Sequence, residues 1–484
     1  MRKSTSHSSD STPRCAPHVR RLALAADYGV VGVVGVVAII AVVAAVAACG
    51  GRAPSPSGEP PRVERDTIPP KVVAESLPPE TIEDVNAPQE PGLLENSQVV
   101  RIALAAGVPR VTISATGEWK LYDSNGESTL LHGDGGEQWI IEPERGGLRA
   151  SRLDGAPTGV RPAPFIARSI ARGSYVIVNG KKYRGEVAVI PAPGGLSVIN
   201  RLYMEDYLRG VVPLEIGQHR TEDERAAVEA QAVAARSYAY THLVSERERP
   251  YDMLATVLDQ VYGGADAEVP LSDRAVFGTT RIVLTYNGRI INAPYHSTCG
   301  GTTSAASEVW KEGDEPYLVA VSDRIPGTAD RYYCDPSPVF RWTRTYDQTT
   351  LRAALDKYLR SYAAVPSEGI GVIRSVEVGS RTPSGRVHTL GIGTSRGHFS
   401  LRGNDIRFVL RSAGGEILNS TYFSVESRQN PDGGLTSLTI EGHGNGHGIG
   451  MCQWGAIGRA RAGADYRTIL RTYYPGTTVA AVSR

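Results

Sequence analysis

YLRGVVPLEIGQHRTEDERAAVEAQAVAARSYAY, residues 207–240, is the stretch that decides how the middle of the chain folds. Pro213 fixes its own backbone and biases the residue before it toward extended structure, so we expect a strand end there. Glu215 then falls on the loop that follows the strand. Thr221 and Glu224 have the spacing of a capping box, and the alanine-rich run after them has high helix propensity. The stretch therefore predicts one glutamate on a loop directly before a regular helix.

Polar side chains recur along this predicted helix. By the three-to-four-residue periodicity of a helix, Gln231 and Tyr238 share one face, and so do Glu229 and Arg236. The alanines between them allow close packing. One interpretation is a buried helix whose Gln, Arg and Tyr satisfy one another's hydrogen bonds, and composition alone favours it. The alternative, a helix that serves a catalytic glutamate, needs support from elsewhere in the sequence.

That support comes from a resemblance. The segments EDYLRGVVPLEI (205–216) and AQAVAARSYAY (230–240) resemble the signature of the stage II sporulation protein D family (SpoIID/LytB). The match continues, in order and spacing, through DQVYGG (259–264), YHSTCGGTTSAASEVW (295–310), PYLVAV (316–321), GHGIGMCQWGA (446–456) and ILRTYYPGT (469–477). The resemblance covers roughly the last three fifths of the chain. A chance match of several segments in the same order is far rarer than a chance match of one motif.

The family resemblance implies a lytic transglycosylase that cleaves the N-acetylmuramic acid to N-acetylglucosamine bond of peptidoglycan glycan strands. Hydrolysis of a glycosidic bond normally uses two carboxyl groups. In a lytic transglycosylase the sugar's own hydroxymethyl oxygen attacks the anomeric carbon and leaves an anhydromuramic end, so one carboxyl serves as acid and then as base. Glu215 stands at the family's acid position and is predicted to be catalytic. Apolar neighbours such as Val212 and Ile216 predict a desolvated carboxyl with a raised pKa.

The same resemblance assigns further side chains to the substrate groove or to its support: Gln231, Arg236, Tyr238, His296, His447 and Gln453. No cofactor is expected, apart from an alternative zinc ion, since some members of the resembled family hold zinc near the histidine that corresponds to His296. Glu205 and Asp206 are the nearest rival carboxylates, but they stand at the entry to a short helix or turn, where the helix dipole stabilises acidic side chains. We therefore expect both to be structural.

The N-terminal segment has the features of an export signal. Arginines precede an apolar stretch that ends in VAACG, residues 46–50, which resembles a bacterial lipobox. Residues 1–49 are therefore predicted to be a signal peptide and lipobox, in which cleavage before Cys49 leaves this cysteine lipidated at the start of the mature chain. The alternative is an uncleaved signal anchor, since an apolar run of about twenty residues is enough to span a bilayer. Both interpretations attach the chain to a membrane and place the rest of it outside the cytoplasm.

Three cysteines remain beyond this segment: Cys299, Cys334 and Cys452. A Cys299–Cys334 disulfide is the preferred interpretation, because an exported chain meets oxidising conditions and both residues lie in loop-like segments. The alternative is zinc, for which His296 and Cys299 form an HxxC pair that lacks a second close pair. Cys452 stands where the family usually has serine, which favours the role of a small buried side chain.

Composition divides the rest of the chain into three parts. Residues 50–98 are rich in Pro, Glu and Ser and predict a disordered linker. Residues 99–172 alternate apolar and polar side chains between turn residues, which predicts a β-rich accessory region. Residues 173–484 hold the motifs and are predicted to be the catalytic domain. The expected fold class is α+β, with mostly antiparallel sheets and an alanine-rich helix behind the catalytic loop.

The charge of the 484-residue chain is balanced: 52 Lys and Arg face 51 Asp and Glu, a net charge of +1. This balance gives no reason to expect nucleic acid as a partner. The expected partners are peptidoglycan glycan strands, the membrane and a cell-wall amidase, because the LytB side of the family is associated with modifying an amidase. Two other functions stay open at this point. One is a non-catalytic, glycan-binding activator of an amidase, and the other is a zinc-dependent hydrolase built on His296 and Cys299.

Overall fold

The computed structural model describes residues 72–73, 98–124, 126–153, 155, 157–244, 249–310 and 315–482. The predicted signal segment with Cys49, and nearly all of the predicted linker, lie outside these residues. Within the described ranges, no helix is both long enough and apolar enough to cross a membrane. The predicted fold class is confirmed, since helices accompany sheets whose strands are mostly antiparallel.

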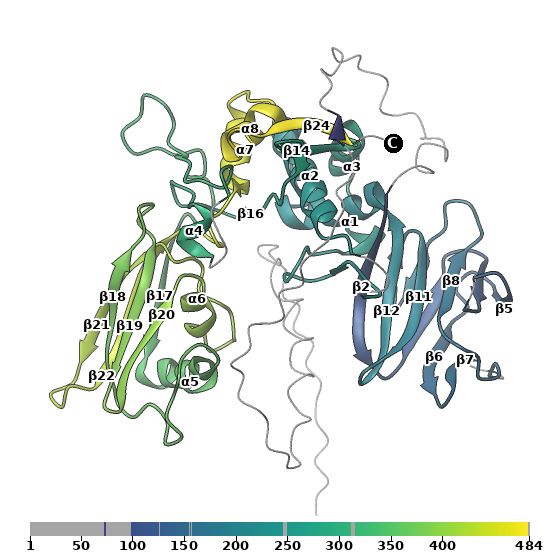
Figure 1. The fold of residues 1–484 in the computed structure, drawn as a ribbon, viewed down its shortest axis with the longest axis horizontal. Helices are drawn as coiled ribbons and strands as arrows, with labels where there is room; N and C mark the ends of the chain where they lie inside the picture. Colours follow the sequence, from purple (N-terminus) through teal and green to yellow (C-terminus); the bar gives the residue numbers. More distant parts are fainter. Residues whose placement is uncertain are drawn as a thin grey trace, which may run out of the picture. The chain divides into compact units, whose positions relative to one another are not determined.

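The first long strand of the described chain, residues 99–108, lies in a seven-stranded sheet (Figure 1). Its strands, in spatial order, are β13 (Met253–Leu254), β2 (Val99–Val108), β12 (Gly195–Tyr203), β11 (Glu186–Ala192), β8 (Phe165–Ser169), β4 (Trp119–Tyr122) and β5 (Thr129–Gly133). All neighbours are antiparallel except β13 and β2. In β4 the predicted alternation is present, because Trp119 and Leu121 are buried and Lys120 is only half-buried.

A five-stranded sheet shares the hydrophobic core of the first one. Its strands are β10 (Lys181–Tyr183), β9 (Val176–Val178), β3 (Val111–Ala115), β6 (Trp139–Glu144) and β7 (Gly147–Arg152). Buried side chains such as Ile113 and Ile141 belong to the same cluster as those of the seven-stranded sheet. Strands from both sides of residue 172 lie in each sheet, so the predicted accessory region and the start of the predicted catalytic domain pack as one body.

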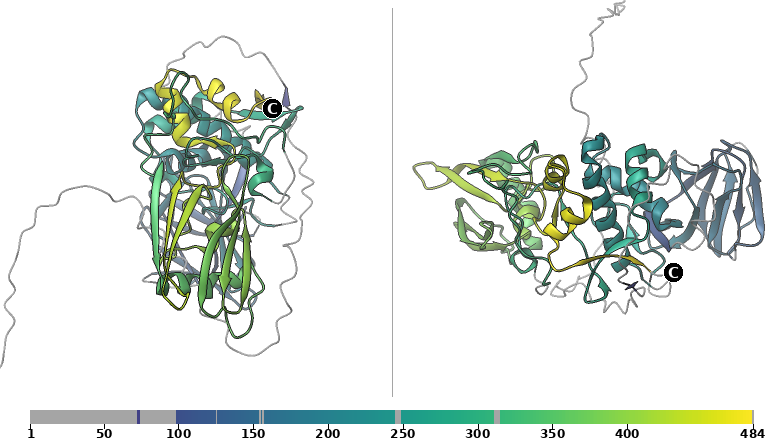
Figure 2. Two further views of the ribbon diagram at one scale, coloured as in Figure 1. Left: turned by 90° about the vertical axis from the view of Figure 1, so that its left-hand side faces the viewer. Right: turned by 90° about the horizontal axis from the view of Figure 1, so that it is seen from above.

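Three helices follow β12 and contact one another: α1 (Met204–Ile216), α2 (Arg225–Thr241) and α3 (Pro270–Gly278). Figure 2 shows them from above beside the blue strands of the first sheet. The predicted capping box of Thr221 and Glu224 is confirmed at the 3₁₀ helix η3 (Glu222–Glu224), which leads into α2. Helix α2 is buried on most sides, because its alanines let neighbouring helices approach closely.

The expectation of a strand end before Glu215 is wrong. Residues 210–213 belong to α1, which continues to Ile216 with Pro213 inside it. Val211 and Val212 are both fully buried in the first core, and a helix directly after β12 buries them there. Burial of this apolar face outweighs the local preference that Pro213 imposes, and the hydrogen bond that Pro213 cannot make is lost in the final turns of the helix.

The rest of this first core consists of short elements. They are η4 (Gly264–Ala267), α4 (Ala306–Val309), α7 (Gln453–Arg461) and α8 (Tyr466–Tyr473), the sheet β1 (Val72–Val73), β24 (Thr478–Val482), β14 (Ile282–Tyr286) and β15 (Arg289–Ile290), and the parallel pair β16 (Tyr295–His296) and β23 (Met451–Cys452). The β16–β23 pair joins two of the sequence motifs across a long interval of the chain.

That interval contains a second hydrophobic core, which no sequence signal predicted. Its strands are β17 (Arg341–Asp347), β18 (Ile373–Arg381), β19 (Val387–Thr394), β20 (Gly397–Arg402), β21 (Phe423–Gln429) and β22 (Leu435–His443), and its helices are α5 (Gln348–Tyr358), η5 (Leu359–Ser361) and α6 (Asp405–Val409). They form two antiparallel three-stranded sheets, β17–β22–β21 and β18–β19–β20, beside which α5 and α6 lie (Figure 1). The chain passes from the first core to the second after Phe340 and returns to the first core at Ile449.

Candidate active site

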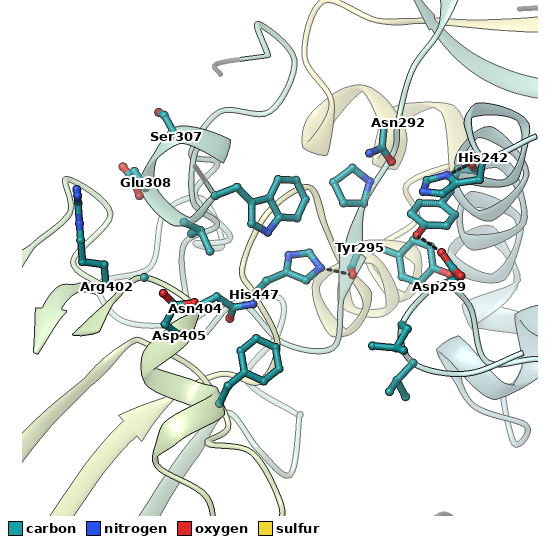
Figure 3. A pocket seen from close by; sticks show the side chains of 18 of the residues that line it. His242, Asp259, Asn292, Tyr295, Ser307, Glu308, Arg402, Asn404, Asp405 and His447 are labelled. Atoms are coloured by element: carbon teal, nitrogen blue, oxygen red, sulfur yellow. Dashed lines mark hydrogen bonds between the residues drawn. The ribbon is translucent and has the colours of Figure 1, made fainter. Parts of the chain in front are cut away.

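A cavity of about 1050 Å³ is lined by residues from both cores. The first core contributes the end of α1, part of α2, the loop of residues 257–261, β16 and α4, and the second core contributes the end of β20 and the start of α6. Figure 3 shows polar side chains pointing into this cavity from opposite sides, with His447 between them. Such a volume is at the upper end of the range for small-molecule pockets, about 300–1,000 Å³, and suits an extended ligand.

Glu215 lies in this cavity, on the last turn of α1. Its Oε1 accepts a hydrogen bond from the backbone N–H of Val261 at 3.0 Å. Burial raises the pKa of Glu215 to about 7, and the hydrogen bonds from Val261 and from the Gln453 side chain lower it only in part. No Lys or Arg of the described chain forms an ion pair with this carboxyl. Near neutral pH it can therefore both give and take a proton.

Gln453 and Gln231 support Glu215 from behind. Gln453 is the first residue of α7, and its Nε2 donates to Oε1 of Gln231 at 3.2 Å. Both side chains are buried. The sequence predicted both residues for the groove or its support, and the structure brings Gln453 to Glu215 and Gln231 to Gln453. Neither of the two amides lines the cavity itself.

Tyr238 and its neighbours form one wall of the cavity. The phenol of Tyr238 donates to Oδ1 of Asp259 at 3.5 Å and stacks on His242, with ring centroids 3.8 Å apart. Asp259 is itself held by the backbone N–H of Leu254, which donates to Oδ2 at 2.8 Å. Tyr238 is thus placed in the cavity, as predicted, while His242 and Asp259 are added to it by the fold (Figure 3).

His447 lies at the centre of the cavity as a neutral ring. Its Nδ1 accepts from the backbone N–H of Ile449 at 3.1 Å, so the proton is on Nε2, which donates to the carbonyl of Tyr295 at 2.9 Å. Burial lowers the pKa of His447 to about 3. With both nitrogens engaged and the ring uncharged, His447 offers the ligand a flat surface, as does Trp310, whose ring centroid is 5.4 Å away.

His296 is buried behind His447, with ring centroids 5.5 Å apart. Its Nδ1 donates to the carbonyl of Ile449 at 3.1 Å, so in the neutral ring Nε2 is an acceptor. That Nε2 has no hydrogen-bond partner among the described residues. Burial lowers the pKa of His296 well below its usual value. The predicted groove residue therefore lies directly behind the cavity wall.

Arg236 does not line the cavity. Its side chain is completely buried and makes two contacts with Glu205, Nε to Oε1 at 3.1 Å and Nη2 to Oε2 at 2.6 Å. The same guanidinium also donates to the carbonyls of Ile282 and Val276. Arg236 thus joins α1, α2, α3 and β14. Of the two roles predicted for Arg236, groove or support, this placement is that of a support. Glu205 is structural, as predicted, although it pairs with Arg236 and does not cap the helix.

The cysteines lie outside the cavity. Cys299 and Cys334 are adjacent, as the predicted disulfide requires, but their sulfur atoms are 3.5 Å apart and both are free thiols, as is Cys452. The disulfide stays a prediction. The metal-capable group around Cys299 in the described chain contains Asp323, Cys334 and Cys452 and does not include His296, and the zinc pair of His296 and Cys299 stays a prediction.

Several cavity residues escaped the sequence analysis. Trp310 ends one of the quoted segments and could have been named from it. The residues of the second core had no such signal: His388, Arg402, Gly403, Asn404, Asp405 and Phe408. Arg402 Nη2 lies 3.0 Å from His388 Nε2, and both side chains line the cavity. In Figure 3, Arg402 lies on the opposite side of the cavity from His242 and Asp259. Only the folded arrangement of the two cores reveals this wall.

The fold and the site correspond to a known class of domain. Residues 192–286, which contain α1, Glu215 and α2, match the family described as stage II sporulation protein (SpoIID). The predicted resemblance to the SpoIID family is therefore confirmed, and it is carried by this domain. Residues 328–450, which contain the second core, match a domain of unknown function (DUF8618).

Individual relatives extend this assignment. The chain is 28% identical over 392 residues to an uncharacterized protein of Brachyspira hyodysenteriae, covering 80% of this chain and 95% of that protein. It is 29% identical to the stage II sporulation protein D of Bacillus subtilis, covering 58% of this chain and 75% of that one. It is 31% identical to the amidase enhancer of the same organism, of which it spans 40%.

Proposed function

We propose that the chain acts on the bacterial cell wall as a lytic transglycosylase of peptidoglycan glycan strands. The observation that carries this proposal is Glu215, a carboxyl in a large cavity with a pKa near 7 and neutral hydrogen-bond donors only. A group with this pKa is suited to protonate a leaving oxygen and later to remove a proton. The relatives named for sporulation and for amidase enhancement support a role in the cell wall.

The proposed reaction needs no second carboxylate. Protonated Glu215 gives its proton to the glycosidic oxygen as the bond from that oxygen to C1 of the muramic ring breaks. The hydroxymethyl oxygen of the same ring then bonds to C1, and the Glu215 carboxylate takes the hydroxyl proton. The products are an anhydromuramic end and an N-acetylglucosamine end with a free hydroxyl, and Glu215 is protonated again. The flat rings of His447 and Trp310 are suited to contact sugar rings beside it.

Attachment to the membrane is part of the proposal. Lipidation of Cys49, or retention of the apolar segment as a signal anchor, would hold the enzyme on the outer side of a membrane with its substrate. Labelling of cells with a lipid precursor that carries a detectable fatty acid tests this directly. We expect label on the wild-type chain and none on Cys49→Ala; equal labelling of both would exclude the lipobox.

The activity is tested with the full-length chain purified in detergent and incubated with glycan strands. Mass spectrometry of the products should reveal anhydromuramic ends with the wild-type chain and none with Glu215→Gln. Glu222→Gln is the matched control, because Glu222 is an exposed glutamate of the neighbouring η3. Unchanged glycan with the wild-type chain, or anhydro ends that persist in Glu215→Gln, would overturn the proposal.

The second candidate is a non-catalytic activator of a cell-wall amidase, favoured by the relative named amidase enhancer. In this case the cavity would hold glycan without cleaving it. Mixing the chain with an amidase should then raise the release of stem peptides equally for wild type and Glu215→Gln, with no anhydro ends. A rise that depends on Glu215 would instead link the effect to cleavage of the glycan.

A further inference from the structure

Four buried side chains outside the cavity gather their ligand atoms in one place. Cys299, Asp323, Cys334 and Cys452 are each completely buried, and their sulfur and carboxylate oxygen atoms all lie within 4.8 Å of one another. Cys299 lies in the loop after β16, Asp323 in the loop after residues 316–321, Cys334 in a later turn and Cys452 in β23. None of the four lines the cavity of Glu215. The fold therefore brings together side chains that are far apart in the sequence.

The spacing within this cluster fits a shared ion. Cys299 Sγ is 3.5 Å from Cys334 Sγ and 3.4 Å from Asp323 Oδ2. Sulfur atoms that share a tetrahedral zinc ion, at Zn–S distances of about 2.3 Å, lie about 3.8 Å apart. A covalent disulfide needs about 2.05 Å. Three thiols and one carboxylate also provide the four ligands that a closed structural zinc site requires.

Backbone amides already face the sulfur atoms. The N–H of Gly301 donates to Cys299 Sγ at 3.4 Å, and Cys452 Sγ accepts from Cys299 N–H at 3.1 Å and from Gly455 N–H at 3.3 Å. Donors of this kind stabilise thiolates, which are the form that binds metal. Gly455 approaches the cluster so closely that a Cβ there would lie 2.1 Å from Asp323 Oδ2.

The carboxylate of Asp323 is oriented by its second oxygen. Oδ1 accepts hydrogen bonds from Tyr473 Oη at 2.6 Å and from Arg459 Nη2 at 3.0 Å, while Oδ2 faces Cys299. Ligand carboxylates of metal sites are commonly held in this way. Three thiolates and Asp323 carry four negative charges, and a divalent ion together with Arg459 would neutralise all but one of them. Zinc binding would release the protons of the three buried thiols, and the ion would then balance most of the charge that this release creates.

We propose that Cys299, Cys334, Cys452 and Asp323 bind one zinc ion, which fastens the loop after β16 and the start of α7 to the loop of Asp323. The site is closed, because all four positions are filled by protein, and its role is structural. Cys452 directly precedes Gln453, the residue that supports Glu215. The ion would thus fix the register of α7 behind the cavity. This proposal does not depend on which reaction the cavity performs.

The metal content of the full-length chain tests the proposal. The chain is purified without chelator from cells grown with zinc, and its metals are measured by mass spectrometry. We expect about one zinc per chain, and Cys299, Cys334 and Cys452 should each react with an alkylating agent after unfolding in chelator. The proposal would be overturned if the chain contained no zinc, took up none when zinc was added and carried a Cys299–Cys334 disulfide. The predicted disulfide would then replace the zinc site.

Variants and a second metal locate the site. Cys452→Ser and Asp323→Asn should each reduce the zinc content well below one per chain, whereas His443→Gln, a histidine outside the cluster, should retain it. Replacement of zinc by Co²⁺ in the wild-type chain should give the charge-transfer absorption of thiolate ligands, a readout that needs no variant to fold. Full zinc content in both ligand variants, or a cobalt spectrum without thiolate bands, would show that the metal binds elsewhere.

Discussion

Glu205 and Glu215 lie near opposite ends of α1, and the same helix gives them opposite surroundings. The side chain of Glu205 is about 3% exposed and forms a two-point ion pair with Arg236. Glu215 is partly buried, faces a cavity and has only the neutral donors of Val261 and Gln453. Both are removed from water, but only one of them has a cation to balance its charge.

The comparison shows what distinguishes a structural acid from a chemical one. The two-point ion pair with Arg236 joins Glu205 to the helices that surround it. At Glu215 no cation opposes the effect of burial, and the neutral donors of Val261 and Gln453 oppose it only in part, so the neutral form is competitive near pH 7. Proximity in sequence and a shared helix therefore say nothing about function. The partner of the carboxyl and its access to a cavity decide it.

The largest expected effect separates the two glutamates by activity. Under the proposed function, Glu215→Gln removes the proton donor and should lower the rate of anhydro-end formation by about 10³–10⁴-fold, at the upper end of general acid–base contributions. Folding should be intact, because the amide keeps the volume of the side chain. Circular dichroism and thermal unfolding check the fold. A variant with more than a tenth of wild-type activity would contradict the assignment.

The next effect concerns stability, for which Glu205 is the glutamate expected to matter most. Glu205→Gln leaves the guanidinium of Arg236 buried without an anion, and we expect a loss of about 3–4 kcal/mol in the free energy of unfolding. Denaturant titration measures it. The double variant Glu205→Gln/Arg236→Met should recover part of the loss, since it removes the unpaired charge as well. If Glu205→Gln is as stable as the exposed control Glu222→Gln, the ion pair is not the support described above.

The sequence predicted the parts of this comparison that depend on local chemistry. Thr221 and Glu224 form the expected capping box, and the alanine-rich run forms α2. The strand expected before Glu215 is helical instead, because the burial of Val211 and Val212 in the first core overrides the local effect of Pro213. Propensity describes a short segment, whereas this outcome depends on what the segment packs against.

The parts that could not be predicted depend on distant contacts. Periodicity placed Arg236 on a face of α2, but only the fold reveals that this face meets Glu205 and not the cavity. The wall that includes Arg402 lies in a second core whose strands carry no recognisable motif. The pKa of Glu215 likewise follows from its burial and from Gln453, which is more than two hundred residues away in the chain.

A smaller effect should appear in the pH profile of the proposed reaction. Glu215 must be protonated to release the leaving sugar, so activity should fall above about pH 7, tenfold per pH unit.

The free energy of unfolding should also fall as the pH rises. The folded-state pKa of Glu215 lies above the usual 4.5, so its contribution to stability is fully present below pH 4.5 and is lost as the pH rises through 7. Glu215→Gln should therefore gain stability over wild type at pH 8 but not at pH 4, as thermal unfolding can measure.

The smallest effect tests how Gln453 adjusts Glu215. The amide of Gln453 favours the charged carboxyl, so its removal in Gln453→Leu should raise the pKa of Glu215 further and move the alkaline fall of activity to higher pH. The loss of a buried hydrogen bond should cost about 1 kcal/mol of stability. Glu205 has no contact with Gln453, so its ion pair provides the internal control: the pH dependence of the Glu205→Gln variant should match that of wild type. An equal loss of activity at every pH in Gln453→Leu would contradict this role. Gln453 would then contribute packing alone, and the backbone N–H of Val261 would be the hydrogen-bond donor that adjusts the pKa of Glu215.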